Sequence, residues 1–262
     1  MTGLYLLSDG KKREFGFEGL QALARSKCTL CLADLNLGGC FRVSSLTLKS
    51  ISTMKMLCRL ILNGCTNITL EGMTHVAANC SQIETISLNH CGLCVTDKMV
   101  ELVASGMKKL QNVMLSGSPC IGSRSLVAIS KCRFLRRLDL TNCILIDDTS
   151  LMALSEGDFI FGLHSLYLVG CKLVSNTGLT WITDGKSNLH GLSSIKMLSL
   201  KSTRYVVEIL STCLDDTNHI FHFLLHEKCH ENWVDSGART IQIFFCQSKS
   251  FFFWLLATCT RI

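Results

Sequence analysis

Apolar residues recur along the chain in a pattern fixed relative to one small residue per unit, here called the anchor. The anchors are spaced 25, 26, 27, 25, 28 and 32 residues apart, at Cys40, Cys65, Cys91, Ser118, Cys143, Cys171 and Thr203. A period in this range indicates an architecture in which each repeat is one supersecondary unit. The pattern therefore predicts seven successive units of one kind.

Three apolar positions precede every anchor, at eight, five and three residues before it. All of them are Leu, Ile or Val: Leu32, Leu35, Leu37; Leu57, Leu60, Leu62; Ile83, Ile86, Leu88; Leu110, Val113, Leu115; Leu135, Leu138, Leu140; Leu163, Leu166, Leu168; and Ile195, Leu198, Leu200. The last two positions are two residues apart, as on one face of a strand. A short strand is expected before each anchor.

The second part of each unit has a different spacing, with apolar residues eight and eleven positions after the anchor. These are Leu48, Ile51; Met73, Val76; Met99, Leu102; Leu126, Ile129; Leu151, Leu154; and Leu179, Ile182. A spacing of three indicates the buried stripe of a short helix. Four polar residues are expected to cap these helices by accepting hydrogen bonds from first-turn amides: Asp97, Ser123, Asp148 and Asn176.

No single unit of strand, turn and helix can bury its apolar face alone, so neighbouring units must stack. The predicted fold is an α/β solenoid with parallel strands on its concave face and helices on its convex face. We expect residues 1–31 to form a degenerate N-terminal repeat, residues 32–206 the array of about seven repeats, and residues 207–262 a non-repeat hydrophobic tail. Two interpretations of that tail stay open: a poorly ordered ending that comes from a gene model or splice variant, and an aberrant hydrophobic cap over the last repeat.

The motifs carry a family resemblance. Residues 135–143 (LRRLDLTNC), followed by Ile146-Asp147-Asp148, and residues 83–91 (IETISLNHC) resemble the cysteine-containing leucine-rich repeat. Cys80 and Cys132 match a second cysteine of such repeats. The resemblance implies a ribonuclease-inhibitor-like horseshoe that binds proteins. It also implies the substrate-recognition region of F-box receptors, which join Skp–cullin (SCF) ubiquitin ligases in ubiquitin-dependent protein degradation.

One feature departs from that family: no F-box precedes the array, because residues 3–26 already have the pattern of a decayed repeat with Leu20 and Leu23 on its helix. Ligase subunits are therefore expected as partners only if an F-box lies upstream. The alternative is a general leucine-rich-repeat scaffold without a ligase connection.

Composition limits which classes of partner and which cellular compartments are expected. Sixteen cysteines without a leader peptide indicate reduced thiols in the cytoplasm or nucleus. A net charge of +6 without a basic block interleaved with aromatic residues does not favour nucleic acid. The longest apolar stretch, residues 251–259, is shorter than the roughly 20 residues of a membrane span. We expect a protein partner and neither nucleic acid nor membrane.

Candidate catalytic and metal sites are few. His226, Glu227 and His230 form an HExxH pattern, which on a helix is typical of a zinc hydrolase, but no third ligand follows on a suitable scaffold. Cys28-xx-Cys31 and Cys91-xx-Cys94 have zinc-knuckle spacing but lie far apart in sequence. We therefore expect no enzyme activity, no metal and no cofactor, and keep the hydrolase as a remote alternative.

Binding is expected on the concave face, where residues six, four and two positions before each anchor point away from the core. Arg, Tyr and Met are enriched at protein–protein interfaces, and Arg and Tyr are also common among the residues that contribute most of the binding free energy. The candidate partner-binding residues are Arg59, Asn63, Asn89, Met114, Arg137, Asp139, Tyr167 and Lys201.

Overall fold

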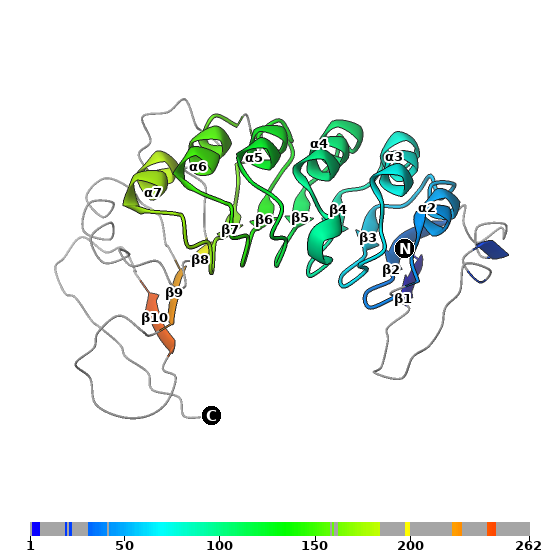
Figure 1. The fold of residues 1–262 in the computed structure, drawn as a ribbon, viewed down its shortest axis with the longest axis horizontal. Helices are drawn as coiled ribbons and strands as arrows, with labels where there is room; N and C mark the ends of the chain where they lie inside the picture. The colour runs from blue at the N-terminus through cyan, green and yellow to red at the C-terminus, as the bar shows by residue number, and fades with distance from the viewer. Residues whose placement is uncertain are drawn as a thin grey trace.

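The fold was determined as a computed structural model of the 262-residue chain. It describes residues 2–5, 19, 21–22, 31–40, 42–157, 159, 162–183, 197–199, 222–226 and 240–244. Strands and helices alternate along an open arc, with the helices on its outer side and the strands on its inner side (Figure 1). This arrangement agrees with the predicted α/β class and is consistent with a leucine-rich-repeat-like solenoid.

The strands form one sheet in which every strand lies beside its neighbour in sequence. Pairing is parallel from β1 to β9 and antiparallel between β9 and β10. The strands are β1 (Thr2–Tyr5), β2 (Leu32–Asn36), β3 (Arg59–Ile61), β4 (Thr85–Ser87), β5 (Asn112–Met114), β6 (Arg137–Asp139), β7 (Ser165–Tyr167), β8 (Met197–Ser199), β9 (His222–His226) and β10 (Thr240–Phe244).

A helix follows each strand from β2 to β7 and packs against the helix of the next unit. The helices are α2 (Ser45–Ile51), α3 (Leu70–Asn79), α4 (Asp97–Gly106), α5 (Ser123–Ile129), α6 (Asp148–Ser155) and α7 (Asn176–Thr183), and a 3-10 turn, η2 (Gly92–Cys94), precedes α4. No helix in the described segments is long and apolar enough to cross a bilayer.

The core lies between the strand row and the helix row as one continuous cluster. Six of the seven apolar triplets fall where side chains are described, and all their residues are buried, which confirms the predicted register. The seventh triplet, Ile195, Leu198 and Leu200, lies outside the described side chains. Because each triplet contacts its counterparts in adjacent units, apolar burial is continuous along the array.

One helical core position was predicted wrongly. Leu102 is only partly buried, whereas Val103 is buried with Met99 on the inner face of α4. A helix has about 3.6 residues per turn, so its buried stripe can continue at the fourth residue instead of the third. The other predicted helix positions, from Leu48 to Ile182, are buried.

A tight turn leads from each strand to its anchor, and the residue just before the anchor has a positive φ. Glycine adopts this conformation readily, and Asn and His are among the side chains that tolerate it best. The six residues are Gly39, Gly64, His90, Gly117, Asn142 and Gly170, with φ between 56 and 77°. The turn geometry is thus repeated even where glycine is replaced.

The predicted caps Asp97 and Asp148 do not cap their own helices. Each is the first residue of its helix, and the residues in the N-cap position are Thr96 and Asp147. Asp97 Oδ1 instead accepts hydrogen bonds from the amides of Gly122 (2.8 Å) and Ser125 (3.2 Å) in the next unit. The carboxylate accepts hydrogen bonds from first-turn amides as predicted, but from those of the next helix and not of its own, because stacking brings that helix within reach.

The same cross-unit contact recurs at Asp148, whose Oδ1 and Oδ2 accept from the Ser175 amide (2.7 Å) and hydroxyl (2.5 Å). Neither of the other predicted caps is shown to act: Ser123 begins α5 after Gly122, which has no side chain to cap with, and the side chain of Asn176 lies outside the described atoms. Adjacent units are therefore joined at their helix starts as well as through the core.

Candidate functional site

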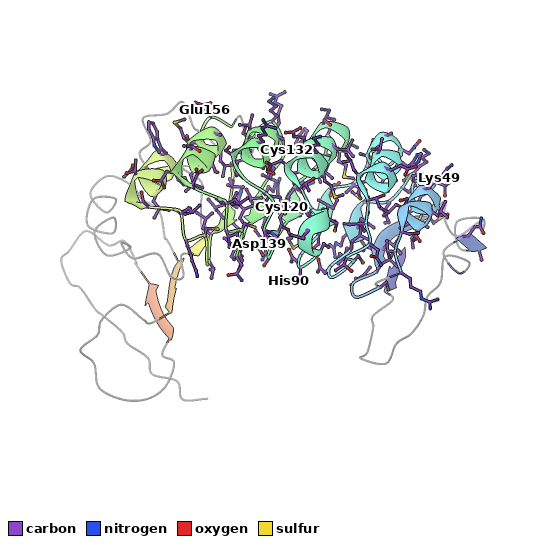
Figure 2. All side chains as sticks on the ribbon, viewed as in Figure 1. Lys49, His90, Cys120, Cys132, Asp139 and Glu156 are labelled. Atoms are coloured by element: carbon purple, nitrogen blue, oxygen red, sulfur yellow. The ribbon has the colours of Figure 1, made fainter. Side chains whose placement is uncertain are left out.

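The strand side of the arc presents side chains on a closely spaced ladder. Asp139 projects from this side, whereas Lys49 and Glu156 lie on the helix side (Figure 2). Parallel strands are roughly 4.8 Å apart, so residues at equivalent positions form rows across the units. The predicted alternation places Arg59, Met114, Arg137, Asp139 and Tyr167 on this strand surface, all partly or fully exposed.

Arg137, Asp139 and Tyr167 form the main cluster of the surface. Asp139 and Tyr167 are paired across β6 and β7, and the Arg137 guanidinium carbon lies 4.9 Å from the centroid of the Tyr167 ring. A cation at this distance is attracted to the face of the ring. Asp139 Oδ1 also accepts from the Thr141 amide at 3.0 Å, which fixes the carboxylate. The three predicted residues therefore lie together, on the surface and in a defined geometry.

Met114 extends this cluster by one strand, because it pairs with Asp139 across β5 and β6. Its side chain is half-buried. An apolar, flexible side chain beside a cation, a carboxylate and an aromatic ring gives the surface both apolar and charged contact groups.

Arg59 lies three strands away and is held by a neighbour. Its Nε is 3.6 Å from Asp34 Oδ1 on β2, with side-chain exposures of 50% and 20%. An exposed pair of this kind contributes little to stability. The guanidinium stays accessible at the N-terminal end of the strand surface.

Asn63 and Asn89 have a structural role that the sequence did not indicate. Asn63 Oδ1 accepts from the Ser87 hydroxyl (2.5 Å) and from the Asn89 amide (3.0 Å), and Asn89 Oδ1 accepts from the Ser116 amide (2.8 Å). Each amide oxygen thus joins its unit to the next. Contact of Asn63 and Asn89 with a partner stays a prediction, and Lys201 lies outside the described residues.

Some positions expected on the concave face are covered. Thr85, Ser87 and Ser116 are buried, and the Thr85 hydroxyl accepts from Asn112 Nδ2 at 3.0 Å. These three positions therefore offer a partner little accessible surface.

The cysteines are held as hydrogen-bonded thiols. All eleven described cysteines are free, and four anchor thiols donate to a backbone carbonyl of the preceding unit: Cys65 to Leu37, Cys91 to Leu62, Cys143 to Leu115 and Cys171 to Leu140, at 3.1 to 3.3 Å. Burial raises the pKa of Cys65, Cys143 and Cys171 to about 12. A thiol with such a pKa is a poor nucleophile near neutral pH.

The structure describes some residues of the two candidate zinc-binding patterns, the Cys-x-x-Cys pairs and the HExxH pattern. Cys91 is an anchor in the core, and Cys94 donates to the Cys91 carbonyl at 2.9 Å; Cys28 lies outside the described residues. His226 is the last residue of strand β9, whereas a zinc-binding HExxH begins on a helix. Glu227 and His230 are not described. Within the described segments no three metal-binding side chains gather.

No protein-family model matches the chain. Among solved structures, the chain is similar to one in the crystal structure of the yeast Rad7 and Elc1 complex, with a TM-score of 0.41 and 16% sequence identity. The match covers 80% of this chain and 66% of that one, so this chain spans just under two thirds of its length.

Sequence reasoning missed a second surface. Four basic residues from α4, α5 and the turns after them line one groove on the helix side, which the net charge of the sequence did not indicate. Their signal was the presence of Lys98 and Arg124 on two consecutive helices, while α3 and α6 contain no Lys or Arg.

Proposed function

We propose that the chain is a leucine-rich-repeat module that binds a protein on its concave strand surface. The observation that carries the proposal is the cluster of Arg137, Asp139 and Tyr167 on adjacent strands. Its cation, carboxylate and aromatic ring are held by neighbouring groups, so little conformational freedom remains to be lost when a partner binds. A partner that covered Tyr167 and paired with Arg137 would gain apolar contact and a charge-assisted hydrogen bond together.

Within that function we further propose a role as the substrate-recognition region of an F-box type ubiquitin-ligase receptor, or of a part of one. The LRRLDLTNC motif and its repeats support this by resemblance. Cytosolic or nuclear residence fits the reduced thiol ladder. A general scaffold without a ligase connection is the competing function. The turnover of a captured partner separates the two: loss of the chain should lengthen the partner's half-life only in the ligase case.

Photo-crosslinking from defined positions tests which face binds. A photoreactive amino acid placed at Ser165, half-exposed on β7, should crosslink the partner from cell extract. The matched control carries the same amino acid at Met152, exposed on α6 of the neighbouring unit. Crosslinking of the same protein from Met152 and not from Ser165 would contradict binding on the strand surface.

A further inference from the structure

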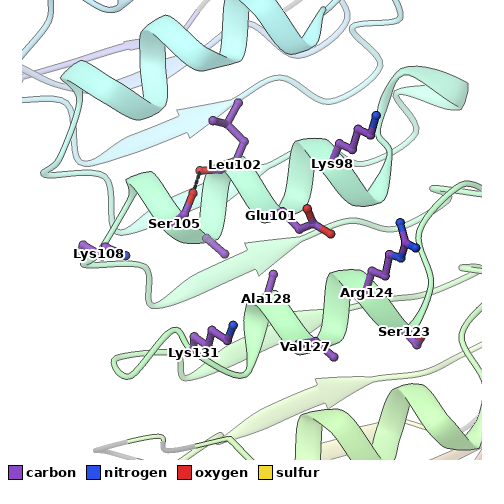
Figure 3. Close-up of a pocket in the computed structure, with 11 residues that line it drawn as sticks. Lys98, Glu101, Leu102, Ser105, Lys108, Ser123, Arg124, Val127, Ala128 and Lys131 are labelled. Atoms are coloured by element: carbon purple, nitrogen blue, oxygen red, sulfur yellow. Dashed lines mark hydrogen bonds between the residues drawn. The ribbon is translucent and has the colours of Figure 1, made fainter.

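A groove runs between α4 and α5 on the helix side of the array, opposite the strand surface. It encloses about 740 Å³. The side chains that line it come from both helices and from the turns that follow them (Figure 3). It is independent of the proposed binding surface, because none of its residues lies on a strand.

Basic side chains occupy both ends of this groove. Lys98 and Arg124 lie at one end, and Lys108 and Lys131 at the other (Figure 3). Glu101 is the single carboxylate among the lining residues, so four cations and one anion leave a net charge of +3. Among the described residues, none of these four cations has a carboxylate within 4.0 Å. Their charges are available to a ligand.

The basic residues of the helical face are unevenly distributed. Helices α2, α4 and α5 contain one Lys or Arg each and α3, α6 and α7 contain none, and the groove adds Lys108 and Lys131 from the turns after α4 and α5. Arg124 lies in the first turn of α5, which contains no acidic residue, and a cation there does not stabilise the helix. Helix stability can account for Lys108 and Lys131, which follow the C-termini of α4 and α5, but not for Lys98 and Arg124 in the first turns.

The floor between the two basic ends is apolar. Leu102 and Ala128 pack partly against the core, and Val127 on α5 is 45% exposed. Polar side chains also lie along the groove: Glu101, and Ser105 toward the Lys108 end, whose hydroxyl is already bonded to the Leu102 carbonyl at 3.0 Å (Figure 3). The groove thus offers apolar area at Val127, and Glu101 disfavours a ligand carboxylate between the two basic ends.

We propose that this groove is a second docking surface, for an extended acidic segment of a partner protein with an apolar residue between its carboxylates. Ten residues of α4 span about 15 Å, which an extended chain covers in about five residues. Carboxylates four or five residues apart reach Lys98 and Arg124 at one end and Lys108 and Lys131 at the other. The apolar residue between them covers Val127. A nucleic-acid strand fits less well, because no aromatic side chain lines the groove for base stacking.

Selection from a random peptide display library, with the 262-residue chain as bait, tests the proposal. Selected peptides should be enriched in Asp or Glu at a separation of four or five residues with an apolar residue between. The variant Lys98→Gln/Lys108→Gln/Arg124→Gln/Lys131→Gln should bind the selected peptide about tenfold more weakly by fluorescence anisotropy. Raising the salt from about 0.05 M to about 0.3 M should weaken wild-type binding similarly.

A matched control removes four exposed lysines outside the groove: Lys49→Gln/Lys55→Gln/Lys109→Gln/Lys172→Gln. This control variant should bind the peptide within about twofold of wild type. The apolar contact is tested separately: Val127→Ser should weaken binding, and so should replacement of the peptide's apolar residue by serine. Arg137→Ala/Tyr167→Ala should leave peptide binding unchanged, which separates this surface from the strand surface.

The proposal is overturned if the selection yields no acidic consensus, if the two charge variants weaken binding equally, or if a single-stranded DNA oligonucleotide binds the groove more tightly than the peptide. Circular dichroism of the groove variant, matching that of wild type, ensures that a loss of binding reports the lost charges. If the groove variant is unfolded, the single variants Lys98→Gln and Lys131→Gln are compared in the same way, and wild-type affinity in both overturns the proposal.

Discussion

At the scale of single residues, the anchor position explains why a small sulfur side chain recurs. The anchor thiols reach a carbonyl of the preceding unit, as Cys143 does at 3.2 Å from the Leu115 oxygen. Ser118 is the exception: its hydroxyl is buried and has no hydrogen-bond partner among the described residues. The shorter C–O bond and smaller oxygen leave the donor unsatisfied where sulfur makes contact.

Replacing Ser118→Cys should stabilise the protein by about 1 kcal/mol, because the thiol fills more volume and can donate as the neighbouring anchors do. Urea unfolding measures the change. Ser118→Ala is the matched control, since it removes the buried unpaired hydroxyl without adding a donor. A Cys variant less stable than the Ala variant would contradict this view of the anchor.

The register of the core is tested at Leu138, which is fully buried on β6. Leu138→Ala should lower the free energy of unfolding by about 2–5 kcal/mol, because it leaves a cavity between three units. Leu145→Ala, at a position 49% exposed, should change it by less than about 0.5 kcal/mol. Equal effects in denaturant melts would reject the register.

At the scale of elements, the starts of α5 and α7 are tied to the unit before them by a carboxylate, Asp97 and Asp148 respectively. Asp97 accepts from two amides of the next unit and from the Ser125 hydroxyl at 2.5 Å. Ser125 is buried, so no water replaces a lost partner there. These contacts fix the start of α5 relative to α4.

Asp97→Ala should therefore cost about 1–3 kcal/mol in the free energy of unfolding, since it leaves buried donors unpaired. Asp97→Asn keeps an acceptor oxygen and should cost less than half as much. Thermal melts of the two variants provide the measurement. An Asn variant as unstable as the Ala variant would show that charge, and not the cross-unit hydrogen bonds, is what stabilises this helix start.

The sequence predicted the units well because burial repeats with a fixed period. Leu35, Leu60 and Ile86 occupy the same position in three successive units, and all lie in the core. The hydrogen-bond partners that join successive units are not indicated by this period. The acceptor role of Asp97 toward Ser125 depends on how far successive helices are offset, and that offset appears only when the units are stacked.

At the scale of the whole molecule, stacking of the units buries a row of anchor thiols, and their burial makes the stability of the fold depend on pH in the same direction. Burial raises the pKa of Cys143 and Cys171 from the ordinary value of 9.0 to about 12. In the unfolded chain these thiols ionise first. Above about pH 9 the unfolded state therefore binds fewer protons than the folded state, and the free energy of unfolding falls as pH rises.

The fall should be at most about 1.4 kcal/mol per pH unit for each such thiol. Urea unfolding at about pH 8 and about pH 10 measures it. Cys143→Ala/Cys171→Ala is expected to be less stable at both values but to lose less stability between them. Parallel losses in variant and wild type would show that other groups set the alkaline limit.

The candidate site was predictable in part for a related reason. Alternation along a strand places Arg137 and Tyr167 on the same face, and the structure places the guanidinium over the ring. The sequence did not indicate that Asn63 and Asn89 join successive units, nor that Lys98 and Arg124 gather with Lys108 and Lys131 in one groove. Both depend on neighbours about 25 residues away, whose alignment the strand pattern alone does not specify.

The affinity of a crosslinked partner for Arg137→Ala/Tyr167→Ala tests the central claim, binding on the strand surface, most directly. The double variant should lose at least about 2 kcal/mol of binding free energy, a factor of about 30 in the dissociation constant, with an unchanged unfolding midpoint. Lys49→Ala/Met152→Ala, which removes two exposed side chains of the helix side, should change the constant by less than about twofold. Wild-type affinity in the strand-surface variant, with loss of binding in the helix-side control, would contradict the account.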